Sequence, residues 1–183
     1  MNIFKTIAED VNNVKRLDPA AQSKFIIWLT YPGLHARWSH VVEHWLWNHG
    51  LKSLARISSQ FTRFMTGVEI HPAAKIGRRF FIDHAMGVII GETCEIGDDV
   101  TLYQGVTLGA LSTRSGQELA GVKRHPTIGD NVTIYANSTV LGGETVIGNG
   151  VIIGGSCFIT KSVPDNTKVS MKNPEMLFKG PQN

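Results

Sequence analysis

Two short segments of the sequence combine a histidine with a charged neighbour: Asp83-His84 and Arg124-His125. An imidazole has an ordinary pKa of about 6.5, so it can take up and release a proton near neutral pH. A guanidinium presents a fork of donors that fits a carboxylate. These residue types favour a catalytic or binding role. Taken alone, each pair also fits a polar corner or a solvated loop, so the surrounding elements must decide between these interpretations.

Most of the chain that carries the two pairs repeats every six residues. Aliphatic residues return at this period between Ile70 and Val163, which neither a helix nor a simple strand shows. The repeating positions are Ile70, Ile76 and Ile82, then Ile90, Ile96, Leu102 and Leu108, then Ile128, Ile134, Val140, Val146, Ile152 and Phe158. The period predicts a parallel β-helix, in which each unit is a short strand plus a turn and three units close one triangular coil.

The repeat has two interruptions, and both contain residues that suit catalysis or binding. The first spans residues 80–88, where Phe80 and then Met86 take the small inward position and Asp83 and His84 point outward. The second, at about residues 109–127, is a polar extruded loop that returns to the prism through Arg124-His125. Loops of this length inside a compact domain are usually functional.

The residues before the repeat are predicted to be helical. Apolar residues at spacings of three and four indicate helices at about residues 2–16, 34–49 and 51–65. Asp18 followed by Pro19 predicts the N-cap and first residue of another helix. The fold class is therefore α+β, with a helical domain at 1–66, a β-helix catalytic domain at 67–165 and a C-terminal tail at 166–183.

Composition limits the possible functions. The net charge of +3 is mild and the basic residues form no dense run, which argues against nucleic-acid binding. The first residues lack the apolar core of a signal peptide, so we expect a cytoplasmic protein that does not bind membranes. The two cysteines form no disulfide framework: Cys94 is predicted to fill an inward slot and Cys157 a corner.

One metal-binding pattern occurs in the helical part. His40, Glu43 and His44 fit H-x-x-E-H, which places two histidines one helical turn apart. We reject a zinc peptidase because the pattern is short and a β-helix follows it instead of a peptidase fold. No metal site is predicted.

Several motifs together resemble the serine O-acetyltransferase family. They are Asp18-Pro19, His44-Trp45-Leu46-Trp47, Ile70-His71-Pro72-Ala73-Ala74-Lys75-Ile76-Gly77, Asp83-His84-Ala85 and Arg124-His125-Pro126. The resemblance covers roughly residues 18–163. It implies a left-handed β-helix of hexapeptide repeats and a short form of the enzyme, which moves the acetyl group of acetyl-CoA to the hydroxyl of L-serine as the first step of cysteine biosynthesis.

The resemblance also assigns the site residues. His84 matches the general base, and Glu69 stands where the family has an aspartate that orients this base, with an arm one methylene longer. Asp18 and Asp83 match the residues that bind the ammonium of serine. Arg124 matches the residue that binds its carboxylate, and His125 matches a second histidine that contacts the substrate.

The acetyl-CoA site and the assembly follow from the same resemblance. In the family, acetyl-CoA lies in a groove between prisms, with its arm along small residues. The matching positions are Gly109, Ala110, Ala136, Gly154 and Gly155. Acetyl-CoA is then a co-substrate, with no tightly bound cofactor, and the active sites lie between the subunits of a homotrimer.

Three departures from the family pattern change these expectations. The loop that ends at His125 is longer, which puts the acceptor in question. Val169-Ser-Met-Lys-Asn-Pro174 replaces the family's closing segment over the CoA nucleotide, so Lys161, Lys168 or Lys172 could meet its phosphates. The sequence ends Gly180-Pro-Gln-Asn183 instead of in the isoleucine tail that family members insert into cysteine synthase, so that complex is not expected. With few N-terminal helices, we expect a single trimer.

Three other functions remain open at this stage. One is an acyltransferase that acts on another hydroxyl acceptor, such as a different amino acid or a sugar. A second is a metal-dependent hydratase of the γ-carbonic-anhydrase type that uses His71, His84 and His125, although their spacing does not fit its paired ligands. The third is a trimeric scaffold without catalytic activity.

Overall fold

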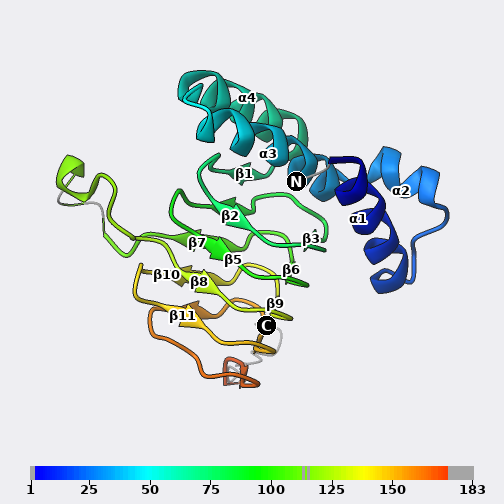
Figure 1. Cartoon of the computed structure of the whole chain (residues 1–183). Coiled ribbons are helices and arrows are strands. Elements are labelled where there is room, and N and C mark those ends of the chain that lie inside the picture. Colours follow the sequence, from blue (N-terminus) through cyan, green and yellow to red (C-terminus); the bar gives the residue numbers. More distant parts are fainter. Residues whose placement is uncertain (1–2, 113, 115, 173–183) are drawn as a thin grey trace, which may run out of the picture.

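The computed structural model describes residues 3–112, 114 and 116–172, and it has a helical part stacked on a prism of short strands (Figure 1). The helices are α1 (Ile3–Leu17), α2 (Lys24–Thr30), α3 (Pro32–Asn48) and α4 (Lys52–Thr66). They lie at one end of the prism, and the extruded loop projects from its side. No helix of the described residues is both long and apolar enough to cross a membrane.

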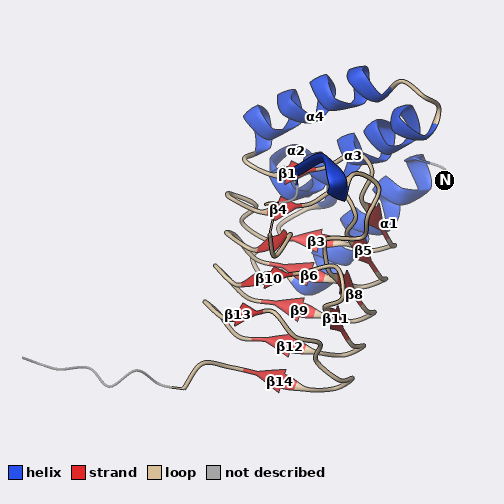
Figure 2. Ribbon diagram, turned by 90° about the vertical axis from the view of Figure 1, so that its left-hand side faces the viewer, coloured by secondary structure: helices blue, strands red, loops and turns tan. Residues whose placement is uncertain are grey.

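The strands form three parallel sheets, one for each face of the prism (Figure 2). Sheet A contains β1 (Glu69–Ile70), β4 (Ile89–Ile90), β7 (Thr107–Gly109), β10 (Thr139–Leu141) and β13 (Phe158–Ile159). Sheet B contains β2 (Lys75–Ile76), β5 (Glu95–Ile96), β8 (Thr127–Ile128) and β11 (Val146–Ile147). Sheet C contains β3 (Phe81–Ile82), β6 (Thr101–Leu102), β9 (Thr133–Ile134), β12 (Ile152–Ile153) and β14 (Lys168–Val169). The chain visits A, B and C in turn, which confirms the predicted left-handed β-helix after a helical domain.

The corners between the faces position the candidate site residues, so we name two of them. The C–A corner consists of the turns that lead from sheet C to sheet A, at residues 83–88, 103–106, 135–138 and 154–157. The A–B corner consists of the turns from sheet A to sheet B, at residues 71–74, 91–94, 110–126 and 142–145. The second includes the extruded loop, which contains a short 3-10 helix at Gly116–Leu119.

The inward positions differ from the sequence prediction in the last coils. Ile147 and Ile153 are buried, whereas Val146, Ile152 and Phe158 are 46%, 38% and 69% exposed. The reason is one additional residue at Gly142-Gly143, which makes the step between inward residues seven positions. The same shift buries Cys157, which was predicted at a corner, while Cys94 is buried as predicted.

Two other local predictions were wrong. Asp18 does not begin a helix: its N–H still donates to the Val14 carbonyl at the end of α1, and α2 starts at Lys24 with Ser23 as its cap. Met86 is 68% exposed, and Ala85 and Val88 fill the interior instead. In the last segment, β14 pairs with β12, so the prism continues past residue 165.

The helical part and the prism share their cores. Ala36 of α3 packs in the prism core, whereas Phe81 of β3 packs with the helical core around Val14, Ile27 and Leu34. At Gly33 the contact between α3 and β3 is especially close, because an added Cβ would lie 2.1 Å from the Ile82 carbonyl oxygen. This packing fixes the helices relative to the first coil, where Asp83 and His84 follow β3.

Candidate active site

His84 lies in a turn of the C–A corner that holds its side chain out toward solvent. His84 and Ala85 both have left-handed backbone angles, with φ of 58° and 61°, which are unfavourable for residues other than glycine. The turn is held by hydrogen bonds from Met86 N to the His84 carbonyl (2.7 Å) and from Gly87 N to the Gly67 carbonyl (2.9 Å). The His84 side chain is 71% exposed, and its Nε2 lies 3.7 Å from Asp83 Oδ2. The imidazole is therefore free to meet a substrate.

Asp18 of the helical part is hydrogen-bonded to Tyr31, which sequence reasoning missed, and Asp83 of the prism lies near enough for its charge to act on the same phenol. The Tyr31 hydroxyl donates to Asp18 Oδ2, while Ala20 N donates to Asp18 Oδ1 at 2.7 Å. Burial, this hydrogen bond and the charges of Asp18 and Asp83 raise the pKa of Tyr31 to about 12. Two carboxylates with one phenol beside them form a locally negative site that suits an ammonium group.

Two stacked tyrosines continue this edge below the carboxylates. Tyr103 follows β6 and Tyr135 follows β9, in the positions that correspond to Asp83 after β3. Their ring centroids are 4.9 Å apart and their planes differ by 14°. Burial and the nearby Tyr135, Asp83 and Asp18 raise the pKa of Tyr103. Asp83, Tyr103 and Tyr135 each directly follow an inward aliphatic residue, one coil apart. This shared position is the sequence pattern that could have revealed the tyrosine pair.

The candidate CoA-binding residues fall on both corners of the chain. Ala136, Gly154 and Gly155 lie on the C–A corner, in coils that follow that of His84. A Cβ at Gly155 would lie 3.3 Å from the Ala136 carbonyl oxygen, so the backbones of these two coils are closely packed at the small residues. Gly109 instead ends β7, and Ala110 begins the A–B corner, where the extruded loop starts.

His125 is held at the A–B corner by Thr93, which the sequence analysis also missed. Thr93 N and Oγ1 lie 3.2 and 2.9 Å from His125 Nδ1, and Thr93 Oγ1 accepts the backbone N–H groups of Arg124 (2.9 Å) and His125 (3.0 Å). Because Nδ1 accepts a backbone N–H, the ring proton is on Nε2. Burial and the charge of Arg124 lower the pKa of His125 to about 4. The ring is therefore a neutral donor of fixed orientation.

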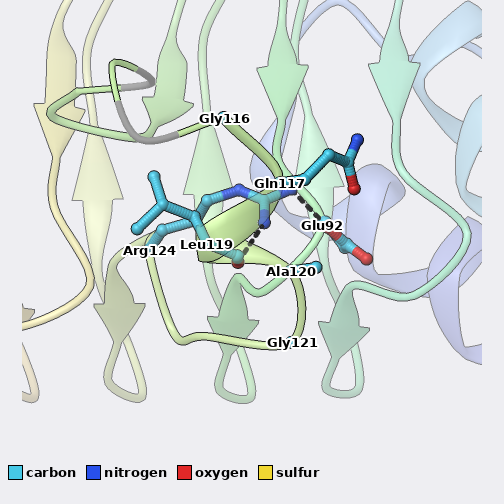
Figure 3. Close-up of a pocket in the computed structure, with 7 residues that line it drawn as sticks. All are labelled: Glu92, Gly116, Gln117, Leu119, Ala120, Gly121 and Arg124. Atoms are coloured by element: carbon cyan, nitrogen blue, oxygen red, sulfur yellow. Dashed lines mark hydrogen bonds and ion pairs between the residues drawn. The ribbon is translucent and has the colours of Figure 1, made fainter.

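Arg124 lies in a pocket of about 420 Å³ beneath the extruded loop (Figure 3). Its Nη2 forms an ion pair with Glu92 Oε2, and its Nη1 donates to the Leu119 carbonyl at 3.1 Å. The pocket is lined by Glu92, Gly116, Gln117, Leu119, Ala120, Gly121 and Arg124. Residues of the extruded loop thus build the surroundings of the arginine that was predicted to bind a carboxylate.

Glu69 points to a different partner from the one predicted. Its carboxylate lies 2.9 Å from Arg63 Nη1 at the end of α4. Among the described residues no hydrogen bond or ion pair joins Glu69 to His84. The two are nevertheless in adjacent turns of the chain, since Glu69 N donates to the Val88 carbonyl just after the His84 turn.

The histidines considered as metal ligands are dispersed or engaged. Glu43 accepts hydrogen bonds from Thr62 (2.6 Å) and Ser58 (3.2 Å), and His44 Nδ1 lies 2.7 Å from the Pro72 carbonyl. His71 and His125 lie on the A–B corner and His84 on the C–A corner. Within residues 3–112, 114 and 116–172, no three His, Cys, Asp or Glu side chains are placed to hold a metal ion together.

The candidate residues therefore form two half-sites on one chain. One half-site is at the C–A corner and contains His84, Asp83 and the small residues of later coils, with Asp18 reaching it from the segment after α1. The other is at the A–B corner and contains Arg124 and His125, with Gly109 at the end of β7 before it. The strands of sheet A are two or three residues long, and with about one turn residue at each end they separate the two corners by about five residues, or about 16 Å at about 3.3 Å per residue. A small acceptor cannot reach both halves within one copy of the chain.

A left-handed β-helix with an extruded loop and an exposed, carboxylate-flanked histidine on its edge defines an acyltransferase of the hexapeptide-repeat class. Comparison with known proteins gives a narrower result. The chain is 54% identical over 166 residues to the serine acetyltransferase of Bacillus pumilus (strain SAFR-032), covering 91% of this chain and 73% of that protein. It therefore belongs to the serine acetyltransferase family. No protein-family model matches it.

Solved structures agree with this assignment. Serine acetyltransferase isoform 3 of Entamoeba histolytica in complex with cysteine superposes with a TM-score of 0.89 at 39% identity, covering 97% of this chain and 62% of that one. A serine acetyltransferase in complex with CoA gives a TM-score of 0.82 at 36% identity, covering 91% and 66%. The chain thus spans slightly less than two thirds of these solved chains.

Proposed function

We propose that the protein transfers the acetyl group of acetyl-CoA to the hydroxyl of L-serine, giving O-acetyl-L-serine and CoA. The observation that supports this proposal is the C–A corner, where an exposed imidazole lies beside Asp83 and near Asp18 on an edge that continues to small residues in later coils. Family membership supports serine as the acceptor, and the similar structure that contains CoA supports acetyl-CoA as the donor.

His84 acts as the general base in this proposal. It takes the proton of the serine hydroxyl while the oxygen attacks the thioester carbonyl. The tetrahedral intermediate then collapses, the carbon–sulfur bond breaks, and the imidazolium returns the proton to the CoA thiolate. Positioned acid–base catalysis of this kind contributes roughly 10²- to 10⁴-fold in rate. Glu69 would orient the imidazole once its carboxylate turns from Arg63 to His84, or once one carboxylate oxygen contacts each of them.

The acceptor is recognised at both ends. The carboxylates of Asp18 and Asp83 bind its ammonium, and the guanidinium of Arg124 binds its carboxylate through donors that Glu92 and Leu119 leave available. The Nε2–H of His125 donates to an acceptor oxygen. Gly109, Ala110, Ala136, Gly154 and Gly155 are proposed to line the path of the acetyl-CoA arm, where small side chains let the ligand approach the backbone. Acetyl-CoA is a co-substrate and is not retained.

A homotrimer with active sites between subunits would unite the two half-sites. In such an assembly the C–A corner of one subunit faces the A–B corner of its neighbour. The cytoplasmic location expected from the sequence stays a prediction.

The reaction is tested by mixing purified protein with acetyl-CoA and L-serine and following the free thiol of CoA. We expect CoA release that depends on serine and is lost in the His84→Ala variant. An acceptor other than serine would show itself as CoA release with that compound and little with serine. Absence of release with every acceptor, or equal activity of His84→Ala, would reject an acetyltransferase that uses this base.

The shared site is tested by complementation. His84→Ala and Arg124→Ala damage different halves, so each pure variant should be inactive. In trimers assembled from equal amounts of both variants, a site is intact where the unmutated C–A corner of one subunit faces the unmutated A–B corner of its neighbour. This restores up to about one quarter of the parent's activity. If the mixture of both variants stays inactive after the two are unfolded and refolded together, the site lies within one chain.

A further inference from the structure

Tyr31 lies at the junction of two helices and has little freedom to move. It ends α2, where its N–H donates to the Ile27 carbonyl at 3.3 Å, and it precedes Pro32 at the start of α3. Its carbonyl accepts the N–H of Leu34 at 3.1 Å. Its ring packs against the buried helical core that includes Ile27 and Phe81. The hydroxyl is therefore presented from a fixed point.

That hydroxyl is bonded to one of the two proposed ammonium-binding carboxylates. It donates to Asp18 Oδ2, and the backbone N–H of Ala20 donates to Asp18 Oδ1 at 2.7 Å. Asp18 itself lies in the turn after α1, not inside a helix. The hydrogen bond from Tyr31 therefore restrains the Asp18 carboxylate from a distant part of the chain, while the Asp18 backbone itself belongs to a turn.

The second carboxylate is brought to the same place by the contact between α3 and β3. Gly33, two residues after Tyr31, packs directly on the Ile82 carbonyl, and Asp83 follows Ile82. The charge of Asp83 acts on the Tyr31 phenol together with that of Asp18. Because burial and both charges raise the pKa of Tyr31 to about 12, the phenol keeps its proton and stays a donor.

We propose that Tyr31 is a positioning residue of the acceptor site: its hydroxyl holds the Asp18 carboxylate so that Asp18 and Asp83 converge on one ammonium group. This rests on the proposed function, in which the acceptor is an amino acid. Two like charges placed near each other repel, and a fixed donor on one of them offsets part of that repulsion before the cation arrives. Tyr31 thereby favours acceptors with an ammonium over neutral alcohols.

The test compares Tyr31→Phe with Thr30→Val, which also loses one hydroxyl, at the exposed preceding residue whose Oγ1 donates to the Ile26 carbonyl of its own helix. We expect Tyr31→Phe to raise the KM for serine about 10-fold, as for loss of one hydrogen bond to a charged group. The KM for acetyl-CoA should not change. 3-Hydroxypropionate keeps the carboxylate and hydroxyl of serine and lacks its ammonium, so its inhibition constant should be the same in both variants and the parent.

Several results would overturn the proposal. One is a Tyr31→Phe enzyme with the parent's KM for serine. Another is a parallel rise in both KM values, or a fall in kcat alone, because loss of structure would act in these ways. A matching change in Thr30→Val would also count against Tyr31. If the parent itself releases no CoA with serine, the proposed function fails, a result that is separate from all of these.

Discussion

Replacing Gly33 with alanine would place a methyl group inside the contact between α3 and β3. The added Cβ would lie 2.1 Å from the Ile82 carbonyl oxygen and 2.9 Å from its Cβ, and both atoms belong to the rigid first coil. An ordinary van der Waals contact is 3.4 to 4 Å, so α3 must move away by more than about 1 Å. Overpacking of this kind costs about 1 to 3 kcal/mol.

A second effect opposes the first, and the magnitudes decide which one wins. Alanine favours a helix over glycine by about 1 kcal/mol in a helix interior, and by less at an end. We therefore expect Gly33→Ala to lose a net 1 to 2 kcal/mol, roughly, in the free energy of unfolding. Because the shift carries Tyr31 away from Asp83, the KM for serine should rise as well.

The assay is urea unfolding followed by far-UV circular dichroism, with steady-state kinetics on the same samples. Ser53→Ala is the control, since it introduces an alanine at an exposed position in the first turn of α4. It should leave the KM for serine unchanged and not reduce stability. If Gly33→Ala is as stable as the parent and binds serine normally, then α3 does not approach β3 as closely as described.

Three further predictions concern the site. His84→Ala should lower kcat by roughly 10²- to 10⁴-fold with the melting temperature unchanged, because the exposed side chain contributes little packing. Thr93→Val should raise the KM for serine and cost about 1 to 3 kcal/mol, because the N–H groups of Arg124 and His125 lose their acceptor. In the folded protein the pKa of His125 is lowered to about 4, whereas the unfolded chain has the ordinary value of about 6.5. The neutral ring therefore contributes fully to the free energy of unfolding above pH 6.5, and this contribution declines as the pH falls toward 4. Between pH 7 and pH 5 the parent should lose about 1 to 2 kcal/mol of unfolding free energy that His125→Asn does not lose, the lower figure allowing for screening by solvent.

Each of these has its own control and contrary result. A melting temperature well below the parent's for His84→Ala would show that the side chain is structural. Thr107→Val changes an outward threonine of sheet A, and an equal effect there would mean that the Thr93 hydroxyl has no special role. If the parent and His125→Asn lose the same unfolding free energy on acidification, His125 has the same pKa in the folded and the unfolded protein.

The sequence alone predicted the prism well because its signal is local. A side chain that must point inward every sixth position leaves a period, and the two defects in that period marked the His84 turn and the extruded loop. The period failed at Met86, inside the first defect, and after one inserted residue in the last coils. Gly142-Gly143 shifts the inward face from Val146 to Ile147, and neighbouring aliphatic residues at both positions leave the pattern ambiguous.

The pairing of side chains required the tertiary structure. The sequence placed Asp18, Asp83, Arg124 and His125 in the site through family resemblance, but gave no sign of Tyr31, Thr93 or Glu92 as their partners. These contacts join residues between 13 and 32 positions apart, and they depend on how α3 packs on β3 and where the loop rejoins the wall. The structure also separated the chemistry between two corners of one chain. Periodicity fixes which residues point outward, whereas only the closure of the coil decides on which edge each one lies.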